Sequence, residues 1–168
     1  LGALGITGAH PALADSIAVD LELVLAVDVS LSMDPDEQQL QRDGYVEALK
    51  SPEVMAAIRA NALGRIGVVY VEWAGHGTHK VTVPWSMIDG PPGAAAFADR
   101  LARAPIMRAQ KTSIASALQF SDGLFGVSGF AGKRRVIDVS GDGPNNDGVP
   151  VTQAREREYR PKRRAVVS

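Results

Sequence analysis

Residues 21–32 read LELVLAVDVSLS, and this stretch decides the fold. Its first seven residues form an almost unbroken apolar, β-branched run, which is typical of a central strand buried on both faces. The run ends abruptly in Asp28, Ser30 and Ser32, three polar residues spaced two apart. The sequence therefore predicts a buried strand that delivers oxygen-bearing side chains at its carboxyl end.

Alternating strand and helix signals surround this segment. Asp34 before Pro35 predicts a helix start, with a capping side chain and proline at the first helical position. Pro84 lies in the second strand of a glycine-rich hairpin, so that strand is expected at a sheet edge. We predict helices over 35–49, from 52, over 94–103 and from about 112 to 125, and strands over 21–27, 65–73, 79–87 and 134–139. This order predicts an α/β fold in three layers: a doubly wound, mostly parallel sheet with one antiparallel edge strand.

Composition narrows the function classes. The chain has 168 residues, enough for one domain with a real core. Its net charge is −1, which gives no global electrostatic argument for nucleic-acid binding. It has no cysteine, which excludes disulfides, cysteine–zinc sites and thiol catalysis. No apolar run approaches the roughly 20 residues needed to span a bilayer.

Three polar loops follow strands or precede a helix at the predicted carboxyl edge of the sheet. Mostly parallel α/β sheets bind their ligands at this edge. The first is Asp28-x-Ser30-x-Ser32, the second holds Thr112, and the third holds Asp142 after the strand at 134–139. Together they offer two carboxylates and three hydroxyls. An oxygen-only set suits Mg²⁺ above all, with Mn²⁺ or Ca²⁺ as substitutes.

Two of these assignments have competitors. Thr112 could instead be the N-cap of the following helix, a role that Ser113 could also fill. Asp147 competes with Asp142 as the acid of the third loop. We prefer Asp142 because it lies nearest the end of its strand.

The segment LVLAVDVSLSM at 23–33 resembles the first strand and metal motif, D-x-S-x-S, of the von Willebrand factor A domain. Thr112 and the SGDG around Asp142 resemble the second and third metal loops of that family, in the same order and with similar spacing. The run RRVIDVSGDGPNNDGVPVTQAR at 134–155 also resembles an uncharacterised bacterial branch of the superfamily, made of exported proteins. The resemblance covers residues 20–157.

This resemblance implies a metal-ion-dependent adhesion site. The hydroxyls of Ser30, Ser32 and Thr112 would ligate Mg²⁺, while Asp28 and Asp142 would act directly or through water. One coordination position would stay open for an Asp or Glu carboxylate of a protein partner. The implied function is metal-dependent protein binding without enzymatic activity.

Two alternatives remain open. A haloacid-dehalogenase-type phosphohydrolase also places an Asp after its first strand and uses Mg²⁺, but it needs D-x-D, and Ser30 replaces the second Asp. The other alternative is a truncated gene product without function.

The two ends of the chain carry separate predictions. Residues 1–19 are interpreted as a signal-peptide remnant and lead-in, with Ala12-Leu13-Ala14 in the form of a cleavage site, so we expect an exported, periplasmic or secreted protein. The domain would occupy 20–157 and a basic tail 158–168. Since the family sheet has six strands in the order 3-2-1-4-5-6, the last two are expected to be missing through truncation or a frameshift. The strand at 134–139 would then be an exposed edge.

Overall fold

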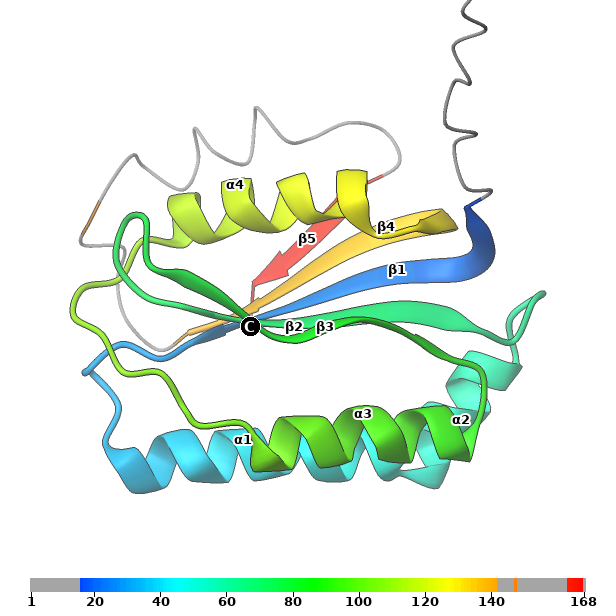
Figure 1. The fold of residues 1–168 in the computed structure, drawn as a ribbon, viewed down its shortest axis with the longest axis horizontal. Coiled ribbons are helices and arrows are strands. Elements are labelled where there is room, and N and C mark those ends of the chain that lie inside the picture. Colours follow the sequence, from blue (N-terminus) through cyan, green and yellow to red (C-terminus); the bar gives the residue numbers. More distant parts are fainter. Residues whose placement is uncertain (1–15, 142–146, 148–162, 168) are drawn as a thin grey trace, which may run out of the picture.

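The computed structural model describes residues 16–141, Asp147 and the backbone of residues 163–167. Within them one sheet lies between two helical layers, with α4 on one face and α1, α2 and α3 on the other (Figure 1). The elements are β1 (Ile17–Asp28), α1 (Pro35–Lys50), α2 (Pro52–Arg59), β2 (Ile66–Trp73), β3 (His79–Ile88), α3 (Pro91–Arg103), α4 (Ile114–Leu124), the short 3₁₀ helix η1 (Phe125–Val127), β4 (Phe130–Ser140) and β5 (Arg163–Val167).

The strands lie in the order β3-β2-β1-β4-β5. β1 pairs in parallel with both β2 and β4, and only the β2–β3 hairpin is antiparallel. The predicted three-layer, mostly parallel sheet with an antiparallel edge strand is therefore confirmed. β3, which contains Pro84, is the edge strand on that side, as the sequence predicts.

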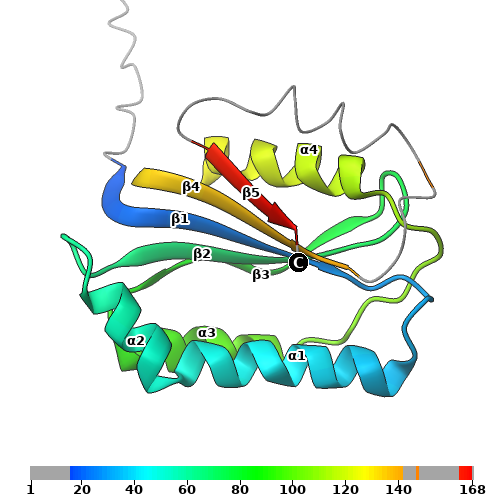
Figure 2. The same cartoon turned by 180° about the vertical axis from the view of Figure 1, so that it is seen from behind.

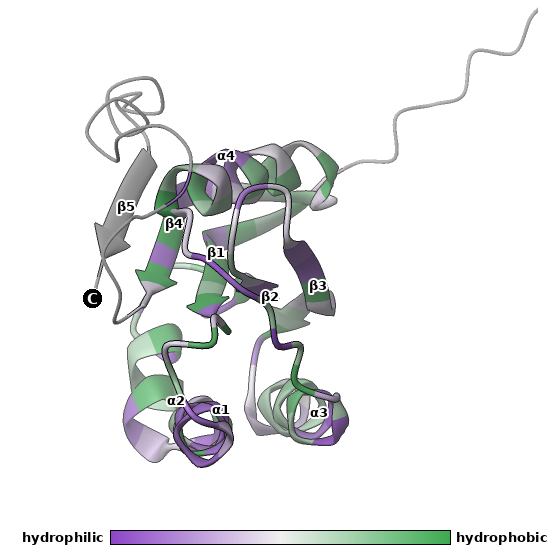
Figure 3. Ribbon diagram, turned by 90° about the vertical axis from the view of Figure 1, so that its left-hand side faces the viewer, coloured by the Kyte–Doolittle hydropathy of each residue, from purple (hydrophilic) through white to green (hydrophobic). Residues whose placement is uncertain are grey.

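β1 is central because both of its faces bury apolar side chains. Leu25 and Val27 pack in the core under α1 and α3, and Val24 and Ala26 pack in the core under α4. Figure 3 shows the result as mainly hydrophobic colouring on the carboxyl-terminal halves of β1 and β4, while α1 is largely hydrophilic. None of the described helices combines the length and apolar character needed to cross a membrane.

One part of the fold prediction is wrong: β5 pairs in parallel with β4, from Arg135↔Arg163 to Val139↔Val167. Figure 2 shows β5 beyond β4, so β4 is an interior strand and not an exposed edge. Ile137 and Val139 are accordingly buried. The sequence did not reveal β5 because five residues with three apolar side chains give too weak a local signal. Its stability comes from backbone pairing with a strand far away in the chain.

The loop after Ser32 is fixed at the start of α1 by a reciprocal cap. The carboxylate of Asp34 accepts hydrogen bonds from the backbone N–H of Asp36 at 2.8 Å and of Glu37 at 2.9 Å. The Glu37 carboxylate accepts in return from the backbone N–H of Asp34 at 2.9 Å. This capping box confirms the predicted helix start and sets the direction in which the chain leaves the Ser32 loop.

A buried ion pair ties α1 to β2. The guanidinium of Arg42 donates to the Glu72 carboxylate, and the two side chains are 2% and 0% exposed. Arg42 also donates to the carbonyl oxygens of Leu101 and Ala104 at the end of α3. The second Glu72 oxygen accepts from the backbone N–H of Met107 at 3.1 Å. This pair thus holds α1, β2, the end of α3 and the segment that follows α3.

Replacing Arg42 should therefore be costly. Arg42→Met leaves the buried Glu72 carboxylate without its cation, and we expect the free energy of unfolding to fall by about 3–5 kcal/mol. Urea unfolding of the variant and the wild type measures this difference.

The matched control is Lys50→Met, which removes the cation of the surface pair Lys50–Asp99, where the two side chains are 43% and 49% exposed. Water screens that pair, so a much smaller loss is expected. Equal losses in the two variants would contradict a central role for Arg42.

Candidate functional site

The carboxyl ends of β1, β2 and β4 meet at one pole of the molecule. Asp28 ends β1, is fully buried, and lies opposite Trp73, the last residue of β2. Ser140, the last residue of β4, lies opposite Val27. The turn between β2 and β3 reaches the same pole (Figure 1). The polar loops that follow β1 and β4 therefore start side by side.

The first loop folds tightly on itself. The Asp28 Oδ1 atom accepts from the backbone N–H of Ser30 at 2.7 Å. The hydroxyl oxygens of Ser30 and Ser32 lie 2.7 Å apart, so these two side chains point to one place. The Gln38 side chain of α1 donates to the Ser30 carbonyl at 3.0 Å and so anchors the loop to α1. The structure thus brings Asp28, Ser30 and Ser32 together, as the motif predicts.

The second loop, residues 104–113, is hydrogen-bonded to the first through its backbone. Ala109 forms a parallel bridge with Ser30: its carbonyl accepts from the Leu31 N–H at 3.0 Å, and its N–H donates to the Val29 carbonyl at 3.3 Å. On the other side, the Ser113 N–H donates to the Ala74 carbonyl, just beyond β2, at 2.9 Å. Thr112 lies between these two anchors and is only 2% exposed. The loop therefore holds Thr112 at the pole where the first loop lies.

The backbone around Thr112 is under strain. Lys111 has φ 67°, the left-handed region, which costs a non-glycine residue of the order of 1 kcal/mol or more. The anchors at Ala109 and Ser113 enforce this conformation. The helix-cap interpretation of Thr112 is not supported, because the cap position of α4 is Ser113, whose side chain makes no capping hydrogen bond.

The third loop begins against Asp28. Gly141 packs so closely that a Cβ atom there would lie 3.2 Å from Asp28 Oδ2 and 3.3 Å from the Trp73 ring. The chain leaving β4 therefore passes directly over the buried carboxylate. Asp142, the next residue and the preferred acid of this loop, lies outside the described residues.

Asp147, the competing acid, is bound to the other loops. Its backbone N–H donates to the Thr112 carbonyl at 3.1 Å. Its Oδ2 accepts from the backbone N–H of His76 at 2.8 Å, and Oδ1 lies 3.7 Å from the Lys111 ammonium. The His76 hydrogen bond and the Lys111 charge lower the pKa of Asp147 against a smaller, opposing effect of desolvation. This carboxylate fastens the β2–β3 turn and the Thr112 loop together.

The described residues fit a hard cation through hydroxyls and not through a carboxylate cluster. Within residues 16–141 and at Asp147, no group of three or more His, Cys, Asp or Glu side chains is placed to hold a metal. The Ser30 and Ser32 hydroxyls are hydrogen-bonded to each other, with 2.7 Å between their oxygens, so two neutral oxygens of the kind that a hard cation prefers lie side by side. The donor chemistry of the first loop therefore agrees with the predicted ion.

Several positioning residues escaped the sequence analysis. Gln38 and Arg42 look like ordinary exposed helix residues in the sequence, yet they are 3% and 2% exposed. Glu72 lies in a strand that is buried along its whole length. The sequence contained one signal for this pair: Glu72 is a charged residue inside an apolar strand, and such a residue requires a buried partner. The sequence does not say which residue supplies it.

The Asp147 contacts predict an acid-dependent loss of stability. A lowered pKa in the folded state stabilises the protein above the unfolded value of about 3.9, and this stabilisation is lost as pH falls through the folded-state pKa. Asp147→Asn should therefore make the free energy of unfolding less pH-dependent below about pH 4.

Urea unfolding at a series of acidic pH values tests this expectation. Lys111→Gln keeps the His76 hydrogen bond and should reduce the pH dependence less than Asp147→Asn does. An Asp147→Asn variant with the wild-type pH profile would show that the carboxylate is not stabilised by these contacts.

The fold is similar to that of several solved proteins. Proximal thread matrix protein 1 from the mussel byssus matches with a TM-score of 0.66 and 17% identity, over 92% of this chain and 39% of the other. A second structure of that protein, with a zinc-occupied MIDAS motif, matches with a TM-score of 0.65 and 16% identity, over 92% and 39%. An aerotolerance-related membrane protein from Bacteroides fragilis matches with a TM-score of 0.53 and 18% identity, over 88% and 66%.

These similarities concern the fold, and the chain spans about 39% of the length of the mussel protein. No curated protein is similar enough in sequence to be matched to this chain. A family model described as protein of unknown function (DUF1194) matches residues 18–166, which runs from β1 through β5 and includes most of the segment 158–168. The chain therefore belongs to the DUF1194 family and has a von Willebrand factor A-like fold.

Proposed function

We propose that this chain is a divalent-metal-dependent protein-binding module of the adhesion type. The observation that carries the proposal is the pair of Ser30 and Ser32 hydroxyls, 2.7 Å apart beside the buried Asp28. The loop that holds Thr112 is hydrogen-bonded to this same segment. A D-x-S-x-S segment arranged in this way presents neutral oxygens to a cation.

Each loop has a separate role in the proposed site. Ser30, Ser32 and Thr112 would hold Mg²⁺, or Mn²⁺ or Ca²⁺ in its place, through their hydroxyls, with Asp28 and Asp142 acting directly or through water. The bound ion would supply a Lewis acid for a carboxylate from the partner. Since the hydroxyls are neutral, they compensate less of the charge of the ion than carboxylate ligands in their place would, which favours an anionic oxygen from outside.

The contacts of Asp147 support Asp142 as the acid of the third loop. The Asp147 carboxylate accepts from His76 and faces Lys111, so it serves the β2–β3 turn. Gly141 lies against Asp28, and the residue after it is the first that the third loop can offer to the site. Asp142 is that residue.

The proposed partner is a protein that offers an Asp or Glu side chain to the ion. Binding would take place outside the cytoplasm. The fold similarities to a byssus matrix protein and to the pilus adhesin SpaC of Lactobacillus rhamnosus GG support this setting. The SpaC match has a TM-score of 0.51 and 17% identity, over 74% of this chain and 15% of SpaC. The A-x-A segment at 12–14 supports export to the periplasm or beyond.

Metal binding can be tested by calorimetric titration of Mg²⁺ and Mn²⁺ into the whole chain. We expect saturable binding that weakens at least about tenfold in Ser30→Ala and in Thr112→Val, each of which removes one ligand oxygen. The matched control for Thr112→Val is Ser113→Ala, since the adjacent, buried Ser113 hydroxyl makes no hydrogen bond to the residues that the structure describes. Binding that survives in Thr112→Val but disappears in Ser113→Ala would contradict the assignment.

A second pair of variants tests which acid of the third loop contributes to metal binding. Asp142→Ala should abolish metal binding, whereas Asp147→Ala should keep it with a less stable fold. A folded Asp142→Ala variant that binds normally, with no binding by a folded Asp147→Ala variant, would transfer the role to Asp147. Circular dichroism establishes that each variant is folded.

A phosphohydrolase assay separates the competing enzyme class. Ser30 occupies the place of the general acid in a haloacid-dehalogenase site, and a serine hydroxyl cannot protonate a leaving group as a carboxylic acid does. We therefore expect no turnover of a generic phosphoester with Mg²⁺. Turnover that disappears in Asp28→Asn would overturn the proposed function in favour of the enzyme.

A further inference from the structure

A basic surface lies on the half of the sheet remote from the candidate metal site, from the starts of β1 and β4 to the middle of β4, where β5 begins opposite Arg135 (Figure 1). We call this surface the basic pole. It comprises the side chains of Arg65, Lys133, Arg134 and Arg135 together with the register positions of Arg163 and Arg164 in β5.

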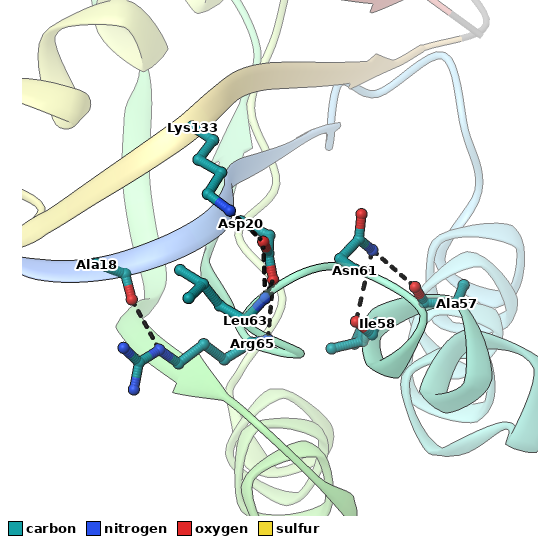
Figure 4. Close-up of polar contacts among 8 residues, drawn as sticks. All are labelled: Ala18, Asp20, Ala57, Ile58, Asn61, Leu63, Arg65 and Lys133. Carbon is teal, nitrogen blue, oxygen red and sulfur yellow. Dashed lines mark hydrogen bonds and ion pairs between the residues drawn. The ribbon is translucent and has the colours of Figure 1, made fainter.

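Close packing brings these charges together. Figure 4 shows Lys133 and Arg65 on either side of Asp20 at the start of the sheet. The Arg65 Nε atom donates to the Ala18 carbonyl at 2.7 Å, and the Lys133 ammonium lies 3.5 Å from Asp20. β5 then adds Arg163 directly opposite Arg135 in the parallel register. Like charges on paired strands repel, so this arrangement favours an anionic partner.

The carboxylates in contact with the basic pole do not neutralise it. Asp20 is 5% exposed. Its carboxylate accepts hydrogen bonds from the backbone N–H groups of Leu63 and Arg65 and forms an ion pair with Lys133. These two backbone hydrogen bonds and Lys133 lower the pKa of Asp20 despite the opposing effect of burial. Glu22 is fully buried beside Arg135. These two buried carboxylates pair with Lys133 and Arg135, and Lys133 still keeps 55% of its side chain exposed.

Exposed apolar side chains lie next to this charge. Ile17, the first residue of β1, is 48% exposed, and Val127 in η1 is 76% exposed. The Ile17 N–H donates to the Gly129 carbonyl at 3.0 Å, which brings the two segments side by side. A nucleic acid would match the charge but not the apolar groups, whereas a lipid surface matches both.

We propose that the basic pole binds membranes that carry anionic lipids. The chain as a whole has a net charge of −1, so attraction to such a surface requires a local concentration of basic residues, which this pole provides. The opposite pole has the acidic first turn of α1, with Asp36 and Glu37. Bound in this orientation, the protein would direct Ser30, Ser32 and Thr112 away from the membrane, toward a partner. The inference stands independently of metal binding.

Co-sedimentation of the whole chain with lipid vesicles tests the proposal. We expect binding to vesicles of phosphatidylcholine mixed with phosphatidylglycerol and none to phosphatidylcholine alone. Raising the salt from about 0.05 M to about 0.5 M should release the protein, because it shortens the range of the attraction.

A charge variant and a matched control locate the surface. Arg134→Gln/Arg163→Gln/Arg164→Gln removes three charges from the basic pole and should weaken binding about 100-fold. Lys80→Gln/Arg100→Gln/Arg103→Gln removes the same charge from the start of β3 and the last turn of α3, and should bind as the wild type does. Val127→Ser should weaken binding about fivefold through its apolar group.

Three results would overturn the proposal. The first is a folded wild-type chain that does not bind the anionic vesicles. The second is an equal loss of binding in the two triple variants, which would indicate net charge and not a surface. The third is tighter binding to duplex DNA than to the vesicles, lost in the same basic-pole variant, which would make nucleic acid the partner.

Discussion

The buried ion pair between Arg42 and Glu72 is the interaction on which the rest of the arrangement depends. It joins α1 to β2, and through further hydrogen bonds it holds the end of α3 and the Met107 backbone. Met107 begins the segment that carries Ala109 and Thr112 to the first loop. A charge pair sealed from water is satisfied only when both partners and their hydrogen bonds are in place. The position of Thr112 relative to Ser30 therefore depends on the buried contacts of Arg42 and Glu72.

Helix α1 reaches two of the three loops. Gln38 donates to the Ser30 carbonyl in the first loop. Gln41 and Tyr45 donate to the Ser140 hydroxyl, which precedes Gly141 and the third loop, at 3.4 and 3.2 Å. Burial raises the pKa of Tyr45, so its hydroxyl stays a proton donor. Because one rigid helix supports both loops, a shift of α1 would move Ser30 and Ser140 together.

The two poles of the molecule have opposite characters because the central strands are parallel. All carboxyl ends point one way, which gathers the oxygen ligands of Asp28, Ser30 and Ser32 at one pole. The amino ends of these strands point the other way, and the basic residues Lys133, Arg134 and Arg135 lie among the first six residues of β4. The parallel topology places the proposed metal site beyond the carboxyl ends of β1 and β4, and the proposed membrane surface nearer their amino ends.

The sequence by itself determined the three-layer α/β fold, the central position of β1 and the membership of Asp28, Ser30 and Ser32 in one loop. These features follow from local patterns: an unbroken apolar run, a capping Asp34 before Pro35, and a proline in the edge strand. The tertiary structure alone decided that β5 covers β4, that Arg42 is the partner of Glu72, and that Asp147 binds the turn at His76. Each of these joins residues at least 28 positions apart. Such contacts are selected by the packing of the whole domain, and no short window of sequence contains both partners.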